Sequence, residues 1–455
     1  MSGLLLLTGV GVSSGAAGPH PVAIIDLGTL GGVGSTARGM NEVGQVTGAA
    51  RSGFSTFNPY VWEQGVMAPL SGVGMCCEGE GWEIAETGHA AGASVSADQP
   101  ALWRDGVETP LGTLGGDSGR ARALNDLDQV VGESEFEPGS LLIHAFFWED
   151  GVMIDLHPPF SDDQSVAYDI NNNSQIVGLA SNPSGGTLAV LWEELVATDL
   201  GSLGGSVSVA YGINELHQIV GYSHEPSGFG QLFFRRAYLW ENGEMRSIHF
   251  DSYFDSSRAI DINNLGMIIG EYDNGDLDER SPAVWLSPDG PSLHVARMLP
   301  PNSRWAPQWM FLEDLNDSGQ IVGLGWHFQP ERGAFEDRGF LITPVEHEFA
   351  LSDVAPGIAG QVNGIRASGL EPGERVYFLY SQRGGGTVLP MCEILDATLQ
   401  LDYPSVITSV RADANGEALL LVEVPAAARA RGDILIQAVV PSSCKLSELR
   451  VVRFE

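Results

Sequence analysis

The eight residues NNNSQIVG (171–178) are one of seven copies of a segment that recurs along the chain with the pattern Asn-x-x-Gly-Gln-(Ile/Val)-Val-Gly. Six copies keep the Asn, whereas AETGHAAG (85–92) is a decayed copy that has lost it. Successive copies begin 40 to 53 residues apart, a spacing typical of repeat architectures. The chain is therefore predicted to contain seven structural units. The copies begin at Asn41, Ala85, Asn125, Asn171, Asn214, Asn263 and Asn316.

Each unit is predicted to hold four short strands. Asn-x-x-Gly makes a tight turn between strands one and two, because Asn caps the turn with its side chain and Gly accepts positive φ. Strand three is a short apolar run that usually ends in Trp, and strand four usually ends in Leu. Four strands in about 45 residues match one blade of a β-propeller. The residues that end strand three are Trp62, Trp103, Trp148, Trp192, Trp240, Trp285 and, in the seventh unit, Ile342, and we expect them to pack between blades.

The two ends of the repeat region indicate a closed ring. AIIDL (23–27) is a lone fourth strand, and the seventh unit stops after its third strand, GFLI (339–342). Pairing of these two segments would leave no open sheet edge at the join, and open edges favour aggregation. The prediction is a seven-bladed β-propeller over residues 22–344, closed by the N-terminal strand.

Several of these elements resemble the HAF-repeat probable extracellular proteins. The hallmarks are DLGTLGG (26–32), the INxxGQVVG-type segments, AFLWE-type strands and one His-Ala-Phe tripeptide (144–146), and the resemblance covers residues 23 to about 343. Units two and seven depart most, since they lack the Asn and the Trp respectively. The resemblance implies an extracellular location and this architecture, but no chemistry, because the family's function is unassigned.

The landmarks stop at about Val345, and residues 345–455 are predicted to form a separate domain. Alternating or apolar strands such as RVYFLYS (375–381), VITSVRA (406–412), ALLLVEV (418–424) and DILIQAVV (433–440) are separated by turns. This pattern favours an immunoglobulin-like β-sandwich. The chain as a whole is therefore expected to be all-β.

Four cysteines in an exported chain favour disulfides. Cys392 and Cys444 are the natural pair, since both lie in the C-terminal segment. Cys76 and Cys77 are adjacent, and either a strained vicinal disulfide or two free thiols would fit.

The N-terminus predicts export. Residues 1–18 combine an apolar stretch, Leu4–Val12, with small residues typical of a signal-peptide cleavage region. The stretch lacks the expected Lys or Arg, so translation could start upstream. No other segment is apolar enough over about 18 residues to span a membrane. We expect a secreted or cell-surface bacterial protein, most simply a monomer.

The charge balance excludes several partners. The formal net charge is −35, which argues against nucleic acid and against anionic membrane surfaces. Such charge could attract cations, and the acidic loop with Asp273, Asp276 and Asp278 has enough oxygen ligands for calcium. Its spacing does not match an EF-hand, so a solvated loop is the simpler interpretation.

No catalytic signature is present. P-loop, HExxH and CxxC patterns are missing from the sequence, so neither nucleotides nor zinc are supported. Gly116-Asp-Ser-Gly119 occupies an inter-strand position of the repeat and is interpreted as a structural connection between strands. No catalytic residue is assigned.

Loop lengths predict where recognition occurs. The connection between strands two and three varies most in length, and variable loops on a rigid scaffold often carry binding sites. On the same face, two consecutive residues near the start of each first strand would surround the channel mouth. We expect either a sugar or polar ligand there, or inter-blade packing with internal ion pairs. The first position is Arg38, Trp82, Arg122, Tyr168, Tyr211, Ile260 and Glu313, and the second includes Glu83, Asp169, Asp261 and Asp314.

Three functions fit these features. The first is an extracellular binding module for a glycan or a protein. The second is a secreted carbohydrate-active hydrolase or lyase, with Glu83 and one of Asp169, Asp261 or Asp314 as acid and base. The third is a structural component of the cell envelope.

Overall fold

A computed structural model gives the structure of the protein. It divides the chain into two compact units, one formed by Val22–Pro344 and the other by the remaining residues. The residues described are 22–53, 57–70, 79–94, 98–140, 142–226, 233–251, 253–274, 280–290, 292–299, 303–344, 350–351, 362–368, 375–381, 384–388, 398–401, 405–411, 413, 417–423, 434–440, 445–446 and 450–452.

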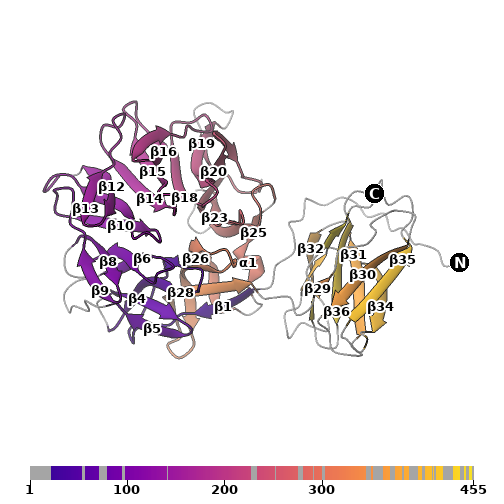
Figure 1. Ribbon diagram of the computed structural model, residues 1–455. Coiled ribbons are helices and arrows are strands. Elements are labelled where there is room, and N and C mark those ends of the chain that lie inside the picture. Colours follow the sequence, from indigo (N-terminus) through magenta and orange to yellow (C-terminus); the bar gives the residue numbers. More distant parts are fainter. Residues whose placement is uncertain are drawn as a thin grey trace. The chain divides into compact units, whose positions relative to one another are not determined.

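The described residues of the first unit form seven four-stranded antiparallel sheets arranged around a ring (Figure 1), which confirms the predicted propeller. Blade 1 consists of β2 (Gly39–Met40), β3 (Val46–Arg51), β4 (Phe57–Glu63) and β5 (Val66–Pro69). Blade 2 consists of β6 (Glu80–Ile84), β7 (Ala90–Ala93), β8 (Pro100–Arg104) and β9 (Val107–Pro110). Blade 3 consists of β10 (Gly119–Leu124), β11 (Val130–Glu135), β12 (Ile143–Glu149) and β13 (Val152–Asp155). Blade 4 consists of β14 (Ser165–Ile170), β15 (Ile176–Ser181), β16 (Thr187–Glu193) and β17 (Val196–Asp199). Blade 5 consists of β18 (Ser208–Ile213), β19 (Ile219–Pro226), β20 (Phe233–Glu241) and β21 (Glu244–Ser247). Blade 6 consists of β22 (Ser256–Ile262), β23 (Ile268–Asp273), β24 (Ser281–Trp285) and β25 (Ser292–His294), and the short helix α1 (Val295–Met298) follows it.

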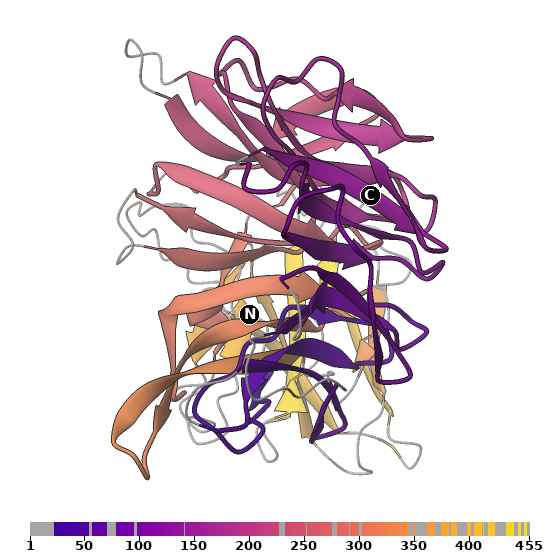
Figure 2. The ribbon, with the colours of Figure 1, turned by 90° about the vertical axis from the view of Figure 1, so that its left-hand side faces the viewer.

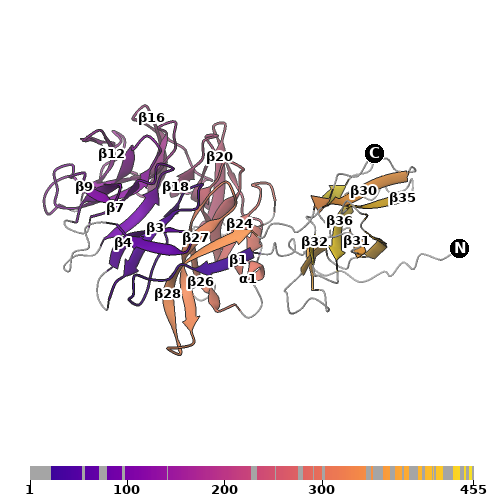
Figure 3. The ribbon, with the colours of Figure 1, turned by 60° about the horizontal axis from the view of Figure 1, so that its bottom comes forward.

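Blade 7 is closed by the other end of the chain, as predicted. It consists of β26 (Trp305–Leu315), β27 (Ile321–Gln329) and β28 (Ala334–Pro344), with β1 (Val22–Asp26) as its fourth strand. The pairing of β1 with β28 places Ile24 opposite Ile342. The hairpin of β27 and β28 is long and extends beyond the neighbouring blades (Figures 2 and 3).

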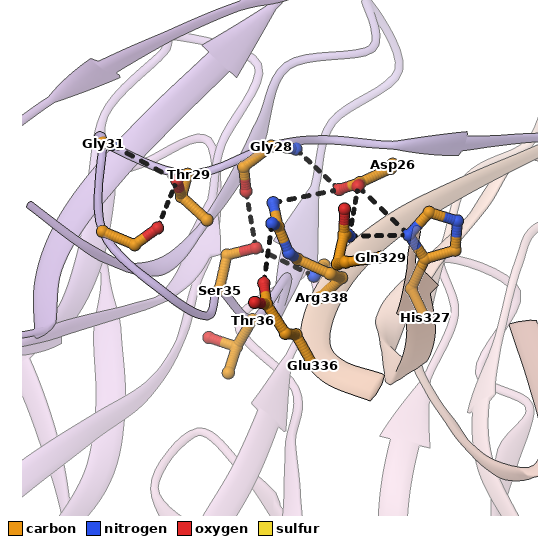
Figure 4. Close-up of polar contacts among 12 residues, drawn as sticks. Asp26, Gly28, Thr29, Gly31, Ser35, Thr36, His327, Gln329, Glu336 and Arg338 are labelled. Carbon is orange, nitrogen blue, oxygen red and sulfur yellow. Dashed lines mark hydrogen bonds and ion pairs between the residues drawn. The ribbon is translucent and has the colours of Figure 1, made fainter. Parts of the chain in front are cut away.

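Polar contacts reinforce this seam (Figure 4). The carboxylate of Asp26 in β1 lies 3.3 Å from His327 Nδ1 and accepts a hydrogen bond from the main-chain N–H of Gly28. Ser35 Oγ donates to the carbonyl of Gly28 and accepts from the N–H of Gly339. These bonds tie the start of the propeller to its last blade.

The core lies between adjacent blades, as the Trp positions predict. One cluster joins Phe147 and Leu156 of blade 3 to Ile176 and Trp192 of blade 4. Trp192 is fully buried, and its indole N–H donates to the carbonyl of Leu156 in the neighbouring blade. Six of the seven positions are buried, and Trp240 is the partly buried one.

The two glycine positions that recur in the motif have different physical causes, and turn chemistry explains only the first. The fourth motif residue does adopt positive φ, as at Gly44 with φ +84° and at Ser174 with φ +59°. The last Gly does not. A Cβ on Gly178 would lie 2.0 Å from the carbonyl oxygen of Val166 in strand one, and the other six blades show the same approach. The last Gly is therefore needed for close backbone packing.

The second unit contains β29 (Ala350–Leu351), β30 (Val362–Ser368), β31 (Arg375–Ser381), β32 (Gly384–Val388), β33 (Thr398–Leu401), β34 (Ser405–Arg411), β35 (Glu417–Glu423), β36 (Ile434–Val440), β37 (Lys445–Leu446) and β38 (Arg450–Val452). They form one sheet in the order β29-β30-β35, one in the order β34-β31-β36-β37 with β38 also on β36, and the pair β32-β33. These sheets agree with an all-β domain, and the immunoglobulin-like sandwich stays a prediction.

The four cysteines and residues 1–18 lie outside the described residues, so the disulfide and signal-peptide predictions also stay predictions. Among the helical residues described, none forms a segment with the length and apolarity required to cross a membrane.

Candidate functional site

A β-bulge in strand one of blades 2 to 7 turns two consecutive residues toward the channel. In blade 4 the register shifts between Ala167 and Asp169, so Tyr168 is the extra residue. A bulge puts neighbouring side chains on one side of the strand, where a regular strand would alternate them. Blades 2 to 7 share the shift, and their extra residues are Trp82, Arg122, Tyr168, Tyr211, Ile260 and Glu313.

The charged and aromatic residues predicted at the channel mouth, together with Ile260, lie around one cavity of about 340 Å³. We call it the mouth cavity. It is lined by all seven residues of the first position and by Glu83, Asp169, Asp261 and Asp314 of the second. Sequence reasoning missed Arg258, Glu271, Met310 and Phe311, which also line it. Arg258 lies two residues before a bulged position, so an alignment of the repeats extended toward the N-terminus would have included it.

Trp82 is held between two guanidinium groups at the wall of the cavity. Arg38 lies 4.7 Å and Arg122 lies 4.5 Å from its ring centroid. Arg38 is fixed by Glu80 and Glu313 of the two adjacent blades, at 2.8 Å each. These contacts agree with the alternative expectation of internal ion pairs, and they fix the position of the aromatic ring.

Two tyrosines continue the wall beyond Arg122. The rings of Tyr168 and Tyr211 lie 5.0 Å apart. Arg122, 5.8 Å from the Tyr168 ring, is paired with Glu133 at 2.6 Å. Burial raises the pKa of both phenols, so they stay protonated and can donate hydrogen bonds at neutral pH. On the blade 6 side, Arg258 and Arg280 share the carboxylate of Glu271.

Four carboxyl groups lie deeper in the channel. Three of them bind backbone N–H groups across blade boundaries: Asp169 accepts from Ile213, Asp261 from Leu315 and Asp314 from Met40. Each also accepts, through its other oxygen, from the N–H of the residue that follows it. These aspartates therefore connect neighbouring inner strands. Glu83 differs, because Oε1 accepts from Ile84 and Oε2 accepts no hydrogen bond among the described residues.

The four carboxyl groups face the channel but are surrounded by protein, and this burial raises their pKa values. Burial and the nearby Asp261 raise the pKa of Asp169 to about 7. Burial, Asp169 and Asp261 hold the pKa of Glu83 well above its ordinary value, and burial with Glu83 and Asp261 does the same for Asp314. Part of this group is therefore protonated at neutral pH.

Two belts of hydrogen bonds surround the opposite end of the channel, and the sequence predicted neither. In the first, the turn Asn of one blade donates from its side-chain amide to the main-chain carbonyl of the matching turn residue in the next blade, as from Asn171 to Asn214 at 3.0 Å. Six of the seven boundaries have this bond, and blade 2 lacks the donor because Ala85 replaces Asn. In the second belt, the N–H of the following residue donates to a side chain of the next blade at all seven boundaries.

The predicted calcium loop is described only in part. Asp273 is buried and paired with Arg235 at 2.6 Å. Asp276 and Asp278 lie outside the described residues, so calcium binding stays a prediction. Within the described part of the chain, no three His, Cys, Asp or Glu side chains are arranged to hold a metal ion.

No protein-family model and no curated protein matches the chain. One similar solved structure is a fungal alcohol oxidase of the AA5 family in complex with copper, with 11% identity over 97% of this chain and 100% of that chain and a TM-score of 0.40. Another is the β-propeller domain of the Trilobed protease from Pyrococcus furiosus, with 12% identity over 71% of this chain and 94% of that chain and a TM-score of 0.40. A third is a gluconolactonase from Xanthomonas campestris, with 12% identity over 57% of this chain and 84% of that chain and a TM-score of 0.32.

Proposed function

We propose that the protein is an extracellular binding module that holds a sugar unit, or a similarly polar small molecule, in the mouth cavity. The observation that carries this proposal is the convergence of Trp82, Tyr168 and Tyr211 around one space, together with guanidinium groups already fixed by ion pairs. Preformed cavities with a few oriented polar groups are typical of small-ligand sites. A pre-organised wall also avoids the loss of side-chain entropy on binding.

The polar groups of the cavity suit ligands with several hydroxyl groups. The carboxyl oxygens of Glu83 and Asp261 can accept hydrogen bonds, while guanidinium and phenol groups donate them. A sugar hydroxyl can do both, and the C–H face of a sugar can pack on the ring of Tyr168 or Tyr211. The extracellular location rests on the apolar N-terminal stretch and on the HAF-repeat resemblance.

Binding can be tested by titrating the full chain calorimetrically with glucose, N-acetylglucosamine, mannose, galactose and galacturonic acid. We expect at least one to bind, and Tyr168→Ala to weaken that binding by about tenfold or more through the loss of a wall ring. Val66→Ala is the matched control, since Val66 is exposed at a turn on the opposite face. Failure of all five sugars to bind, or unchanged affinity in a folded Tyr168→Ala variant, would contradict the proposal.

A second candidate function is a carbohydrate-active hydrolase or lyase. It is favoured by Glu83, whose raised pKa and unbonded Oε2 are suited to a general acid. The three aspartates are less suited, because backbone N–H groups occupy both of their oxygens. A cleavage activity on oligosaccharides that disappears in Glu83→Gln but persists in Asp314→Asn would select this function.

A further inference from the structure

A continuous series of aromatic rings leads out of the mouth cavity along blade 5. From Tyr168 to Tyr211, Tyr222, His224 and Phe233, successive ring centroids lie 5.0, 6.0, 6.3 and 6.0 Å apart. The first two rings line the cavity, and the last is 44% exposed. We call these five residues the aromatic track.

The strand geometry places these rings in line. Tyr222 and His224 are two residues apart in β19, so both side chains point to the same face of blade 5. Phe233 begins β20, and its partner in the ladder is Pro226 at the end of β19. Arg235 lies 5.8 Å from the Tyr222 ring and is held by Asp273 of blade 6. Arg235 of β20 therefore connects the Tyr222 ring of the track to Asp273 in β23 of the next blade.

We propose that the ligand is an uncharged glycan chain, with one sugar unit in the mouth cavity and the following units stacked along the aromatic track. This inference rests on the proposed function, because the track starts at the cavity. Sugar rings present C–H groups that pack on the electron-rich faces of aromatic rings. A row of rings that continues outward is of use to a ligand longer than one sugar.

The distribution of exposed aromatic residues supports a ligand on this side of the ring. In the described part of the propeller, every large exposed aromatic side chain lies on the face of the variable loops. The turns of the opposite face expose aliphatic residues such as Val43, Val66 and Leu265. The aromatic residues are Phe136, Phe233, Phe250, Tyr253, Trp326 and Phe335.

The chemistry of the cavity favours a glycan over a proline-rich peptide, which could also lie in an aromatic groove. Proline has no N–H, so such a peptide has few donors for the carboxylates at the end of the track. The net charge of −35 disfavours polyanionic glycans. Burial and Arg235 lower the pKa of His224, so its ring is neutral at neutral pH and presents no charge along the track.

The test uses the full chain and calorimetric titration with cellohexaose, chitohexaose and mannohexaose, each beside its monosaccharide, with hexagalacturonate as the anionic probe. We expect at least one neutral hexasaccharide to bind about tenfold or more tightly than its monosaccharide. Phe233→Ala should remove most of that gain and leave monosaccharide binding unchanged. Phe335→Ala is the matched control, because Phe335 is 52% exposed near the start of strand three in blade 7 and should keep the gain.

The outcomes separate this inference from the proposed function. If hexasaccharides bind no more tightly than monosaccharides, or if Phe335→Ala removes the gain and Phe233→Ala does not, the track is wrong while cavity binding stands. If Tyr168→Ala changes neither ligand while Phe233→Ala still removes the gain, the cavity is wrong. Binding of a proline-rich decapeptide in place of every hexasaccharide, or preferred binding of hexagalacturonate, also overturns the inference.

Discussion

At the residue scale, the last Gly of each motif connects the repeat to the site. Gly178 accepts the close approach of the Val166 carbonyl, and the neighbouring bulge at Tyr168 aims two side chains into the channel. The same motif residue therefore recurs in every blade, while the channel-facing residues are free to differ. This is why a repetitive framework carries a non-repetitive cavity.

Burial of the channel carboxyl groups predicts a pH dependence of stability. The pKa of Asp169 is about 7 in the folded chain, whereas an unfolded Asp titrates near ~3.9. The folded state therefore binds more protons between these values, so the stabilising contribution is complete below about pH 4 and is lost as the pH rises through about 7. We expect this contribution to the free energy of unfolding, measured by urea titration, to fall between about pH 5 and pH 8.

The variant Asp169→Asn should show a smaller fall over this range, because its side chain does not titrate. Glu244→Gln, at an exposed position in β21, should keep the full dependence. Asp26, Asp128 and Asp251 have lowered pKa values, so their contributions are lost only below about pH 4. The lowered pKa values of His157, His224 and His249 act in the opposite sense up to about pH 6.5, so the decisive quantity is the difference between wild type and Asp169→Asn. The same pH dependence in wild type and Asp169→Asn would contradict the expectation.

At the element scale, the boundary between blades 2 and 3 differs from the other six. Ala85 cannot donate the side-chain bond that closes the Asn belt elsewhere. In its place, Asp128 of blade 3 accepts from Arg104 at 2.8 Å and contacts His89 at 2.7 Å, and both partners belong to blade 2. An ionic contact thus replaces an amide bond at the decayed copy.

Restoring the motif should stabilise this boundary. Ala85→Asn would place an amide donor beside the carbonyl of Asn125 and is expected to add about 1 kcal/mol to the free energy of unfolding. Asn125→Ala should destabilise by more than this amount, since it removes the same type of bond at the next boundary and also the turn bonds that Asn125 Oδ1 accepts from the N–H groups of Leu127 and Gln129. Chemical denaturation of both variants checks this. Equal stability of wild type and Ala85→Asn would show that the belt contributes nothing there.

At the scale of the whole molecule, ring closure depends on β1. Without it, β28 would be an open edge with unpaired N–H and C=O groups, and such edges promote association. A chain lacking residues 1–26 should lose its cooperative thermal transition or form oligomers, as measured by calorimetry and light scattering. A chain lacking residues 1–21 keeps β1 and should keep the cooperative transition and the oligomeric state of the full chain. Identical behaviour of the two truncated chains would refute the role of closure.

The sequence by itself determined the number of blades, the four strands in each and the closing role of the N-terminal strand. These features depend on local turn chemistry and on the alternation of apolar residues, both of which are visible in a single repeat such as 171–178. The offset between the lone strand 23–27 and the incomplete seventh unit then indicated closure. The repeat also indicated which residues would gather at the channel mouth, because equivalent positions of successive blades lie at the same height along the channel.

Only the tertiary structure decided which of these residues meet and what each one does. Arg38 contacts Glu80 and Glu313, which are distant in sequence, and Asp169 binds a backbone N–H of the next blade. The aromatic track combines rings from two blades and four strands. Such contacts arise when neighbouring sheets pack around the ring, so their distances and their burial are properties of the assembled ring, which no single repeat contains.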